Sequence, residues 1–165
     1  MFGSLKGKFG FGKKVGEVLA APVQGKAVAI SEVSDPTFGQ EILGKGVAII
    51  PSVGRVVSPV DGTVEMVFDT KHAISIVSDS GIQILIHVGL DTVSLKGAPF
   101  KEYVEAGQKV KTGDLMLEFD IAAIQAAGLE TITPIVICNT EDYKEIKASV
   151  DKDVVTGDTV LTLVK

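Results

Sequence analysis

Several residue types are scarce in this chain of 165 residues, and their scarcity excludes whole classes of protein. Tryptophan is absent and Cys138 is the single cysteine, so no disulfide can form within the chain and nothing indicates an oxidising compartment. The apolar neighbours of Cys138 predict that it lies in the core. No apolar run approaches the 18 or so residues of a membrane-spanning helix. Residues 1–15 also lack the apolar segment of a signal peptide, so the sequence predicts a cytoplasmic protein.

Familiar catalytic motifs are missing as well. No serine lies in a Gly-x-Ser-x-Gly elbow, and no glycine-rich loop followed by Lys-Ser or Lys-Thr is present to bind ATP. The formal net charge is -5, which argues against a nucleic-acid partner because a phosphate backbone requires a basic surface. The chemistry of the chain must therefore depend on less common arrangements.

Short β-branched or apolar segments occupy most of the chain from Glu17 onward, separated by turn signals such as Asp61-Gly62. This pattern is typical of a sandwich or barrel. We therefore predict an all-β fold, an antiparallel β-sandwich or barrel with one or two short helices. Residues 1–16 are rich in glycine and lysine and are predicted to form a flexible tail, which leaves residues 17–165 as a single domain.

Two short helices interrupt the predicted strands. Asp35 can cap a helix over residues 36–44, which would place Phe38 and Ile42 on one face. A second helix, also capped by an aspartate, is predicted over residues 121–127.

The sequence also contains a weak internal repeat. Residues 21–25 resemble residues 58–62, and residues 110–114 resemble residues 155–158. Two interpretations stay open: one β unit used twice in the barrel, or two common kinds of turn.

The two histidines, His72 and His87, flank a segment that is typical of a strand, a tight turn and a second strand. A two-residue loop, at Asp79-Ser80 or at Ser80-Gly81, would place both imidazoles on one side of the sheet, roughly 5–8 Å apart. A three-residue loop would break this alignment, so the prediction depends on the turn. The same alternation places a hydroxyl and an apolar surround on that side: Thr70, Phe68, Ile74, Leu85 and Gly89.

Two neighbouring imidazoles suit phosphoryl transfer. A neutral imidazole nitrogen is a nucleophile towards phosphorus, and a second imidazole that is protonated near neutral pH can hold the phosphoryl oxygens. The Gly89 carbonyl could accept the Nδ1 proton of His87 and leave Nε2 free to attack. The Thr70 hydroxyl could fix the tautomer of its neighbour.

A zinc-dependent hydrolase that uses the same two histidines is the alternative. A stable zinc site requires three or four protein ligands, and Asp79 and Asp91 are the nearest further candidates in the sequence. No His-x-His, HExxH or Cys-x-x-Cys motif supports the metal. We therefore expect no cofactor.

Longer segments resemble one known family. Residues 85–93, which include His87, resemble the phosphorylation-site motif of the glucose-type enzyme IIA family, in the sugar phosphotransferase system of bacteria. Residues 69–73, which include His72, resemble its second-histidine segment. Further matches lie at residues 35–38, 44–49, 58–62 and 78–81. The similarity covers residues 17–165.

The resemblance implies an antiparallel β-barrel and a phosphocarrier. It implies that His87 accepts a phosphoryl group on Nε2 from the histidine-containing phosphocarrier protein and passes it to a cysteine on the IIB domain of a sugar permease. His72 would be the partner imidazole, and Thr70 would orient it. An apolar docking rim with one charged contact would surround them: Phe38, Ile42, Phe68, Ile74, Leu85 and Val93, with Asp91. The membrane would be reached only through the permease, and regulatory proteins could bind the same face.

Overall fold

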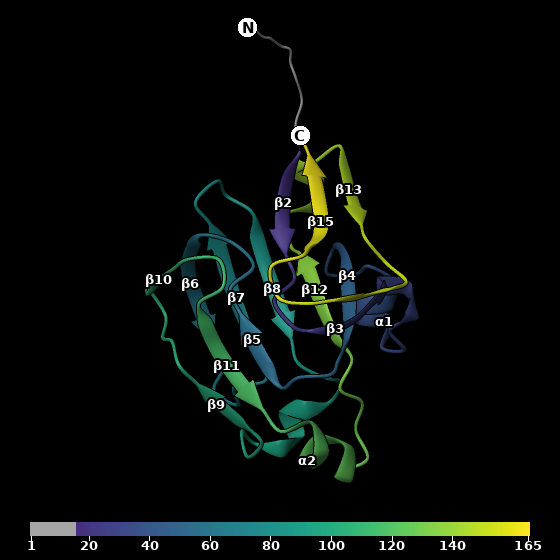
Figure 1. Ribbon diagram of the computed structural model, residues 1–165, viewed down its shortest axis with the longest axis vertical. Helices are drawn as coiled ribbons and strands as arrows, with labels where there is room; N and C mark the ends of the chain where they lie inside the picture. Colours follow the sequence, from purple (N-terminus) through teal and green to yellow (C-terminus); the bar gives the residue numbers. More distant parts are fainter. Residues whose placement is uncertain (1–15) are drawn as a thin grey trace, which may run out of the picture.

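The computed structural model describes residues 16–165, so the predicted flexible tail lies almost wholly outside the described residues. An eight-stranded sheet forms its centre (Figure 1). In spatial order its strands are β10 (Lys109–Val110), β6 (Gly62–Val67), β7 (Ala73–Ser78), β8 (Gln83–His87), β12 (Thr133–Ile137), β4 (Lys45–Pro51), β3 (Gly25–Ala29) and β14 (Lys152–Val154).

Two three-stranded sheets complete the β structure. One contains β5 (Arg55–Val57), β11 (Leu115–Phe119) and β9 (Phe100–Glu102), and the other contains β13 (Glu145–Ala148), β15 (Thr159–Val164) and β2 (Glu17–Ala20). Every pairing is antiparallel. The predicted all-β antiparallel fold is confirmed.

The helices are short. They are α1 (Pro36–Gly39), α2 (Ile121–Ala126) and three 3₁₀ turns, η1 (Ile30–Glu32), η2 (Thr92–Leu95) and η3 (Thr140–Asp142). The carboxylate of Asp35 caps α1 by accepting from Thr37 N at 2.9 Å. This helix ends at Gly39 instead of the predicted residue 44, because Glu41 turns into the left-handed region with φ 59°. Within residues 16–165, no helix has the length and apolar character needed to cross a bilayer.

The weak sequence repeat corresponds to a structural repeat. β3 pairs with β14 through Gly25 and Val154, and β6 pairs with β10 through Gly62 and Val110 in the same way. The pairs β15–β2 and β11–β5 carry the same irregularity in register near the start of the later strand. The interpretation of one β unit used twice is therefore the better of the two.

An approximate twofold relation joins the two units. Ala20 N donates to the carbonyl of Pro59 at 3.1 Å, and Val57 N donates to the carbonyl of Pro22 at 2.8 Å. The strand order of the large sheet is symmetric about its two central strands, β8 and β12. β8 ends at His87, so the candidate site lies next to the centre of the molecule's internal symmetry.

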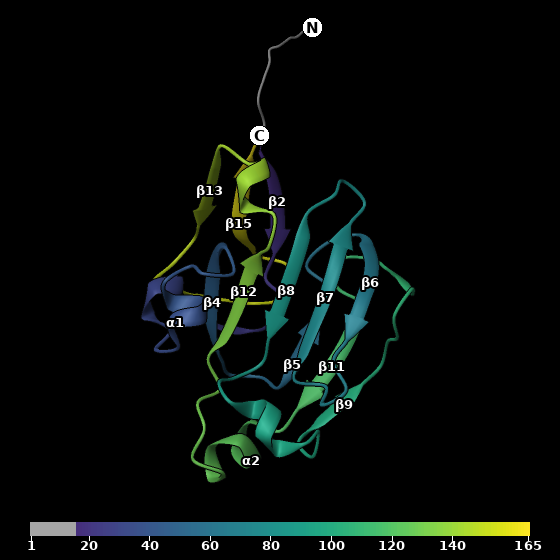
Figure 2. The same ribbon diagram turned by 180° about the vertical axis from the view of Figure 1, so that it is seen from behind.

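The large sheet separates two apolar clusters. The main core lies on one side and includes Ile74, Ile84 and Ile86, each at most 1% exposed. The smaller cluster on the other side includes Phe38, Val136 and, at its margin, Leu85. The segment that holds η1 and α1 folds over this second side, beside β4 (Figure 2). β8 alternates accordingly, with isoleucines turned to the main core and Leu85 and His87 turned to the other side.

Candidate functional site

The first element of the site is the imidazole of His87, the last residue of β8. Its Nδ1 lies 2.8 Å from the carbonyl oxygen of Gly89. A carbonyl can only accept, so Nδ1 carries the proton and Nε2 keeps its lone pair. The Gly89 carbonyl therefore lies where the sequence predicted it.

The second imidazole, His72, lies against the first. The ring centroids of His72 and His87 are 4.8 Å apart, and the two planes meet at 82°. The hydroxyl of Thr70 lies 2.5 Å from Nδ1 of His72, and the ring of Phe68 meets the His72 ring edge-on at 5.5 Å. Thr70, His72 and His87 are thus brought together as predicted.

The turn that joins the two strands is not the one predicted. Ala73 faces His87 and Ser78 N bonds to the carbonyl of Ile82, so the loop has three residues and Gly81 closes it with φ 100°. A three-residue loop of this kind takes a residue in the left-handed region at its end. Strand alternation therefore does not bring the histidines together.

The histidines meet because the chain before β7 is not a strand. β7 begins only at Ala73, and Lys71 has a left-handed backbone with φ 59°. This turn swings the His72 side chain towards His87, and the His72 carbonyl accepts from Val88 N at 2.7 Å. The predicted neighbours are therefore right, but the predicted strand register is wrong.

Burial makes both imidazoles poor bases. Burial first, and then the neighbouring His87, lower the pKa of His72 from 6.5 to about 4. Desolvation also lowers the pKa of His87, against the opposing effects of the Gly89 carbonyl, Asp35 and Asp91. The expectation of a protonated second imidazole is wrong for the unloaded site, because removal from water disfavours the charged form.

The depressed pKa of His72 predicts a pH-dependent loss of stability. Below pH 6.5 the unfolded chain protonates this imidazole while the fold keeps it neutral, so its stability contribution is lost as pH falls from 6.5 to about 4. Over that window wild type should lose about 3 kcal/mol more than His72→Gln. Urea unfolding of both proteins at pH 7, 5.5 and 4.5 measures the difference. Equal pH dependence in the two proteins would contradict the assignment.

The predicted docking rim divides into exposed and covered residues. Ile42 and Val93 are 67% and 52% exposed, while Phe68 and Leu85 are half-buried. Phe38 is buried, but its ring packs on His87 at 4.9 Å between centroids. Ile42 follows the end of α1, so it does not share a helical face with Phe38 as predicted. The apolar surround of the site therefore consists of a buried part at Phe38 and an exposed margin at Ile42 and Val93.

Ile74 was placed on the rim by alternation, and this prediction is wrong. Its side chain is fully buried in the main core, opposite Ile86 on the neighbouring strand. The three-residue loop shifts the register by one residue, which turns Ile74 to the other face of the sheet.

Truncating Ile74 should therefore destabilise the fold. Ile74→Ala is expected to lower the free energy of unfolding by about 2–5 kcal/mol, as for other buried aliphatic residues. Val93→Ala, at an exposed rim position, should change it by less than about 0.5 kcal/mol. Denaturant titration of both variants measures the two free energies of unfolding. An Ile74→Ala variant as stable as wild type would show that Ile74 is not a core residue.

Acidic groups lie beside the site. Asp35 and Asp91 each act electrostatically on His87, and Asp91 is exposed with a left-handed backbone at φ 61°. They give the margin of the site a negative potential that a cationic partner surface would complement.

Cys138 was predicted to be a core residue, and it is exposed instead, just beyond the end of β12. Desolvation, and then the nearby Glu65, raise the pKa of its thiol, so it stays protonated at neutral pH. Within residues 16–165, no group of three or more histidine, cysteine or acidic side chains is arranged to hold a metal ion. A zinc site built on His72 and His87 would thus need its third ligand from elsewhere.

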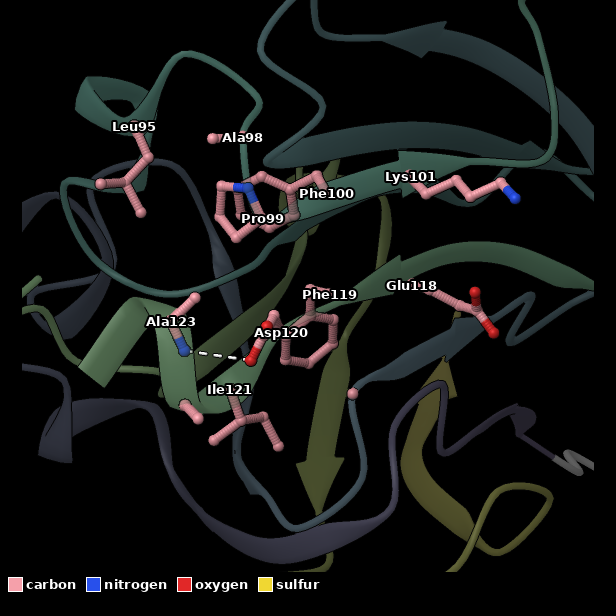
Figure 3. A pocket seen from close by; sticks show the side chains of 12 residues that line it. Leu95, Ala98, Pro99, Phe100, Lys101, Glu118, Phe119, Asp120, Ile121 and Ala123 are labelled. Carbon is pink, nitrogen blue, oxygen red and sulfur yellow. Dashed lines mark hydrogen bonds between the residues drawn. The ribbon is translucent and has the colours of Figure 1, made fainter. Parts of the chain in front are cut away.

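The site is a surface and not a pocket. A cavity of about 800 Å³ lies between β9, β11 and the start of α2, where Asp120 accepts from Ala123 N (Figure 3). Leu95, Phe100 and Phe119 line it, and neither histidine does. The imidazoles lie outside this cavity, where the partly exposed His87 can be approached by another protein's side chain.

Comparison with known proteins identifies the family. The model of the family described as "phosphoenolpyruvate-dependent sugar phosphotransferase system, EIIA 1" matches residues 17–143. The chain belongs to this family. A relative named "PTS system glucose-specific EIIA component", from Oceanobacillus iheyensis, is 45% identical over 140 residues, which are 85% of each chain.

Two further EIIA relatives extend the comparison. The "PTS system beta-glucoside-specific EIIBCA component" of Bacillus subtilis is 49% identical over 127 residues, which are 77% of this chain and 21% of that one. The solved structure titled "glucose permease IIA from Mycoplasma capricolum" superposes with a TM-score of 0.84 at 34% identity, over 93% of this chain and 97% of that one. EIIA domains thus occur both alone and within longer chains, and the fold of this chain is theirs.

Proposed function

We propose that this chain is a phosphohistidine carrier for glucose-type sugars. It accepts a phosphoryl group on Nε2 of His87 from the histidine-containing phosphocarrier protein and passes it to a cysteine on the IIB domain of a sugar permease. The observation that carries the proposal is the bond between His87 Nδ1 and the Gly89 carbonyl, which leaves Nε2 unprotonated beside a second neutral imidazole.

In the first transfer, the Nε2 lone pair of His87 attacks the phosphorus of the donor's phosphohistidine. A new P–N bond forms, the old P–N bond breaks, and the donor imidazole leaves with the electron pair. The proton stays on Nδ1 of His87 throughout, hydrogen-bonded to the Gly89 carbonyl. Because His87 is neutral, no proton has to be removed before the attack, and acceptance should persist at neutral pH.

In the second transfer, a cysteine thiolate of the acceptor attacks the same phosphorus and His87 leaves as a neutral imidazole. The charge on the phosphoryl oxygens requires a fixed donor nearby. When the Thr70 hydroxyl donates to Nδ1 of His72, the His72 proton lies on Nε2 and can serve that role. Once the dianionic phosphoryl group is attached, it favours protonation of His72, so the partner imidazole becomes a better donor when it is needed.

The exposed margin of the site suits transient docking. Both partners must bring a reactive side chain to His87, which an open sheet face allows and a deep pocket would prevent. Ile42 and Val93 supply apolar contact and Asp91 supplies charge, as expected of a modest interface. Regulatory partners of this face and the cytoplasmic location stay predictions.

The direct test is phosphorylation with defined partners. Purified protein is mixed with phosphoenolpyruvate, enzyme I and the histidine phosphocarrier protein, and its intact mass is recorded. We expect a gain of about 80 Da, one phosphoryl group, that is lost in acid. If the upstream proteins are shown to be active and the mass does not change, the proposed function is wrong.

A further inference from the structure

The segment after His87 follows an unusually constrained path. Gly89 and Asp91 both have left-handed backbones, with φ 75° and 61°. A Cβ atom at Gly89 would lie only 2.7 Å from the carbonyl oxygen of Glu130, so the backbone runs in close contact with its neighbours. The orientation of each peptide unit here decides whether the Gly89 carbonyl can reach His87.

The Gly89–Leu90 peptide is bound on both sides. Its carbonyl accepts from Nδ1 of His87 at 2.8 Å, and its N–H donates to the carbonyl of Glu130 at 3.1 Å. A glycine on its own permits many orientations of the adjoining peptides. These bonds therefore depend on how the preceding peptide, Val88–Gly89, is held.

Thr92 holds the Val88–Gly89 peptide. Its side chain is fully buried, and its hydroxyl donates to the carbonyl of Val88 at 2.5 Å. Its methyl group packs against Gly89, since a Cβ built on that glycine would lie 2.7 Å from Thr92 Cγ2. Val88 N in turn donates to the carbonyl of His72. The hydroxyl of Thr92 thus binds the peptide that precedes Gly89, and its methyl group packs against Gly89 itself.

We propose that Thr92 is a positioning residue for phosphoryl transfer: its buried hydroxyl fixes the Val88 carbonyl and thereby directs the Gly89 carbonyl at Nδ1 of His87. The tautomer of a neutral imidazole is set by the hydrogen bond that its other nitrogen makes. Without the hydroxyl, the Val88 carbonyl is buried without this partner, the glycine peptide rotates, and His87 gains the tautomer with a protonated Nε2. That tautomer has no lone pair at the reacting atom. The expected effect on the rate of phosphoryl transfer rests on the proposed function, whereas the expected change of the His87 tautomer does not.

The test compares variants by the ¹⁵N chemical shifts of the His87 ring, which report which nitrogen carries the proton. Thr92→Val keeps the shape and removes the hydroxyl, and it should convert a large part of His87 to the Nε2–H form. Acceptance of the phosphoryl group should slow on the order of 10-fold to 100-fold, the size usual for a misplaced reacting group. Thr92→Ser retains the hydroxyl and should keep the wild-type tautomer.

A matched control separates positioning from stability. Thr133 is equally buried, and its hydroxyl donates to the carbonyl of Thr131 at 2.9 Å. Thr133→Val should therefore lower stability in a similar way and leave the His87 tautomer unchanged. A folded Thr92→Val with the wild-type tautomer overturns the proposal. If Thr92→Val does not fold, Thr92→Ser is measured in its place: the wild-type tautomer is the expected result, and a shift to the Nε2–H form with the hydroxyl retained overturns the proposal.

Discussion

Replacing His87 with glutamine should abolish phosphoryl acceptance completely. The glutamine amide occupies a similar place but has no nitrogen lone pair that can attack phosphorus. His72 cannot substitute, because it is buried, with only 5% of its surface exposed. Incubation with phosphoenolpyruvate, enzyme I and the histidine phosphocarrier protein should therefore leave the mass of the variant unchanged.

Two further proteins make this result specific. Cys138→Ser removes the single thiol of the chain and should gain about 80 Da as wild type does. Circular dichroism of His87→Gln should show the wild-type fold, since the side chain lies at the margin of the smaller apolar cluster. A mass gain on folded His87→Gln would move the acceptor to another residue and remove the basis of the proposed function.

Replacing His72 with glutamine should separate the two transfers. The tautomer of His87 is held by Gly89 and not by His72, so the variant should still accept the group. The acceptor step is different, because an anionic thiolate approaches phosphoryl oxygens that already carry charge. The loss of one donor to those oxygens should slow this step by roughly 10²–10³-fold.

The measurement starts from phosphorylated protein freed of its donor. The rate of phosphoryl loss is followed by intact mass after a purified IIB domain is added to wild type and to His72→Gln. Thr70→Val is the companion variant, because it keeps His72 but removes the hydroxyl at Nδ1 and should give a smaller defect. Wild-type onward transfer by His72→Gln would contradict the role of the partner imidazole.

The sequence predicted the fold class because its signals are local. Short β-branched segments and turn residues indicated strands, and most strands of the large sheet lie where they were expected. The strands that were missed, such as β9 and β13, are short edge strands that each carry two charged residues. Charge protects an exposed edge from pairing with other chains, and it also removes the apolar pattern by which a strand is recognised.

The candidate site was predicted in composition but not in detail. Which side of the sheet Ile74 faces depends on one extra residue in the loop at Gly81, and sequence alternation cannot show that residue. The loop is held from a distance, since Asn139 donates to the carbonyl of Gly81 and accepts from Gln83 N. The low pKa of His72 likewise arises from burial by the whole fold.

The first and last strands of the described chain are neighbours, and this limits how the domain can be attached to other domains. Glu17 pairs with Leu163, so the first and last strands leave the barrel side by side, while the end of β8 that carries His87 points away from them towards α2 (Figures 1 and 2). In a longer chain such as the Bacillus subtilis relative, a tether at that end would not cover the reactive face. The domain could then swing on its tether between successive partners, at effective concentrations on the order of millimolar, without ever detaching.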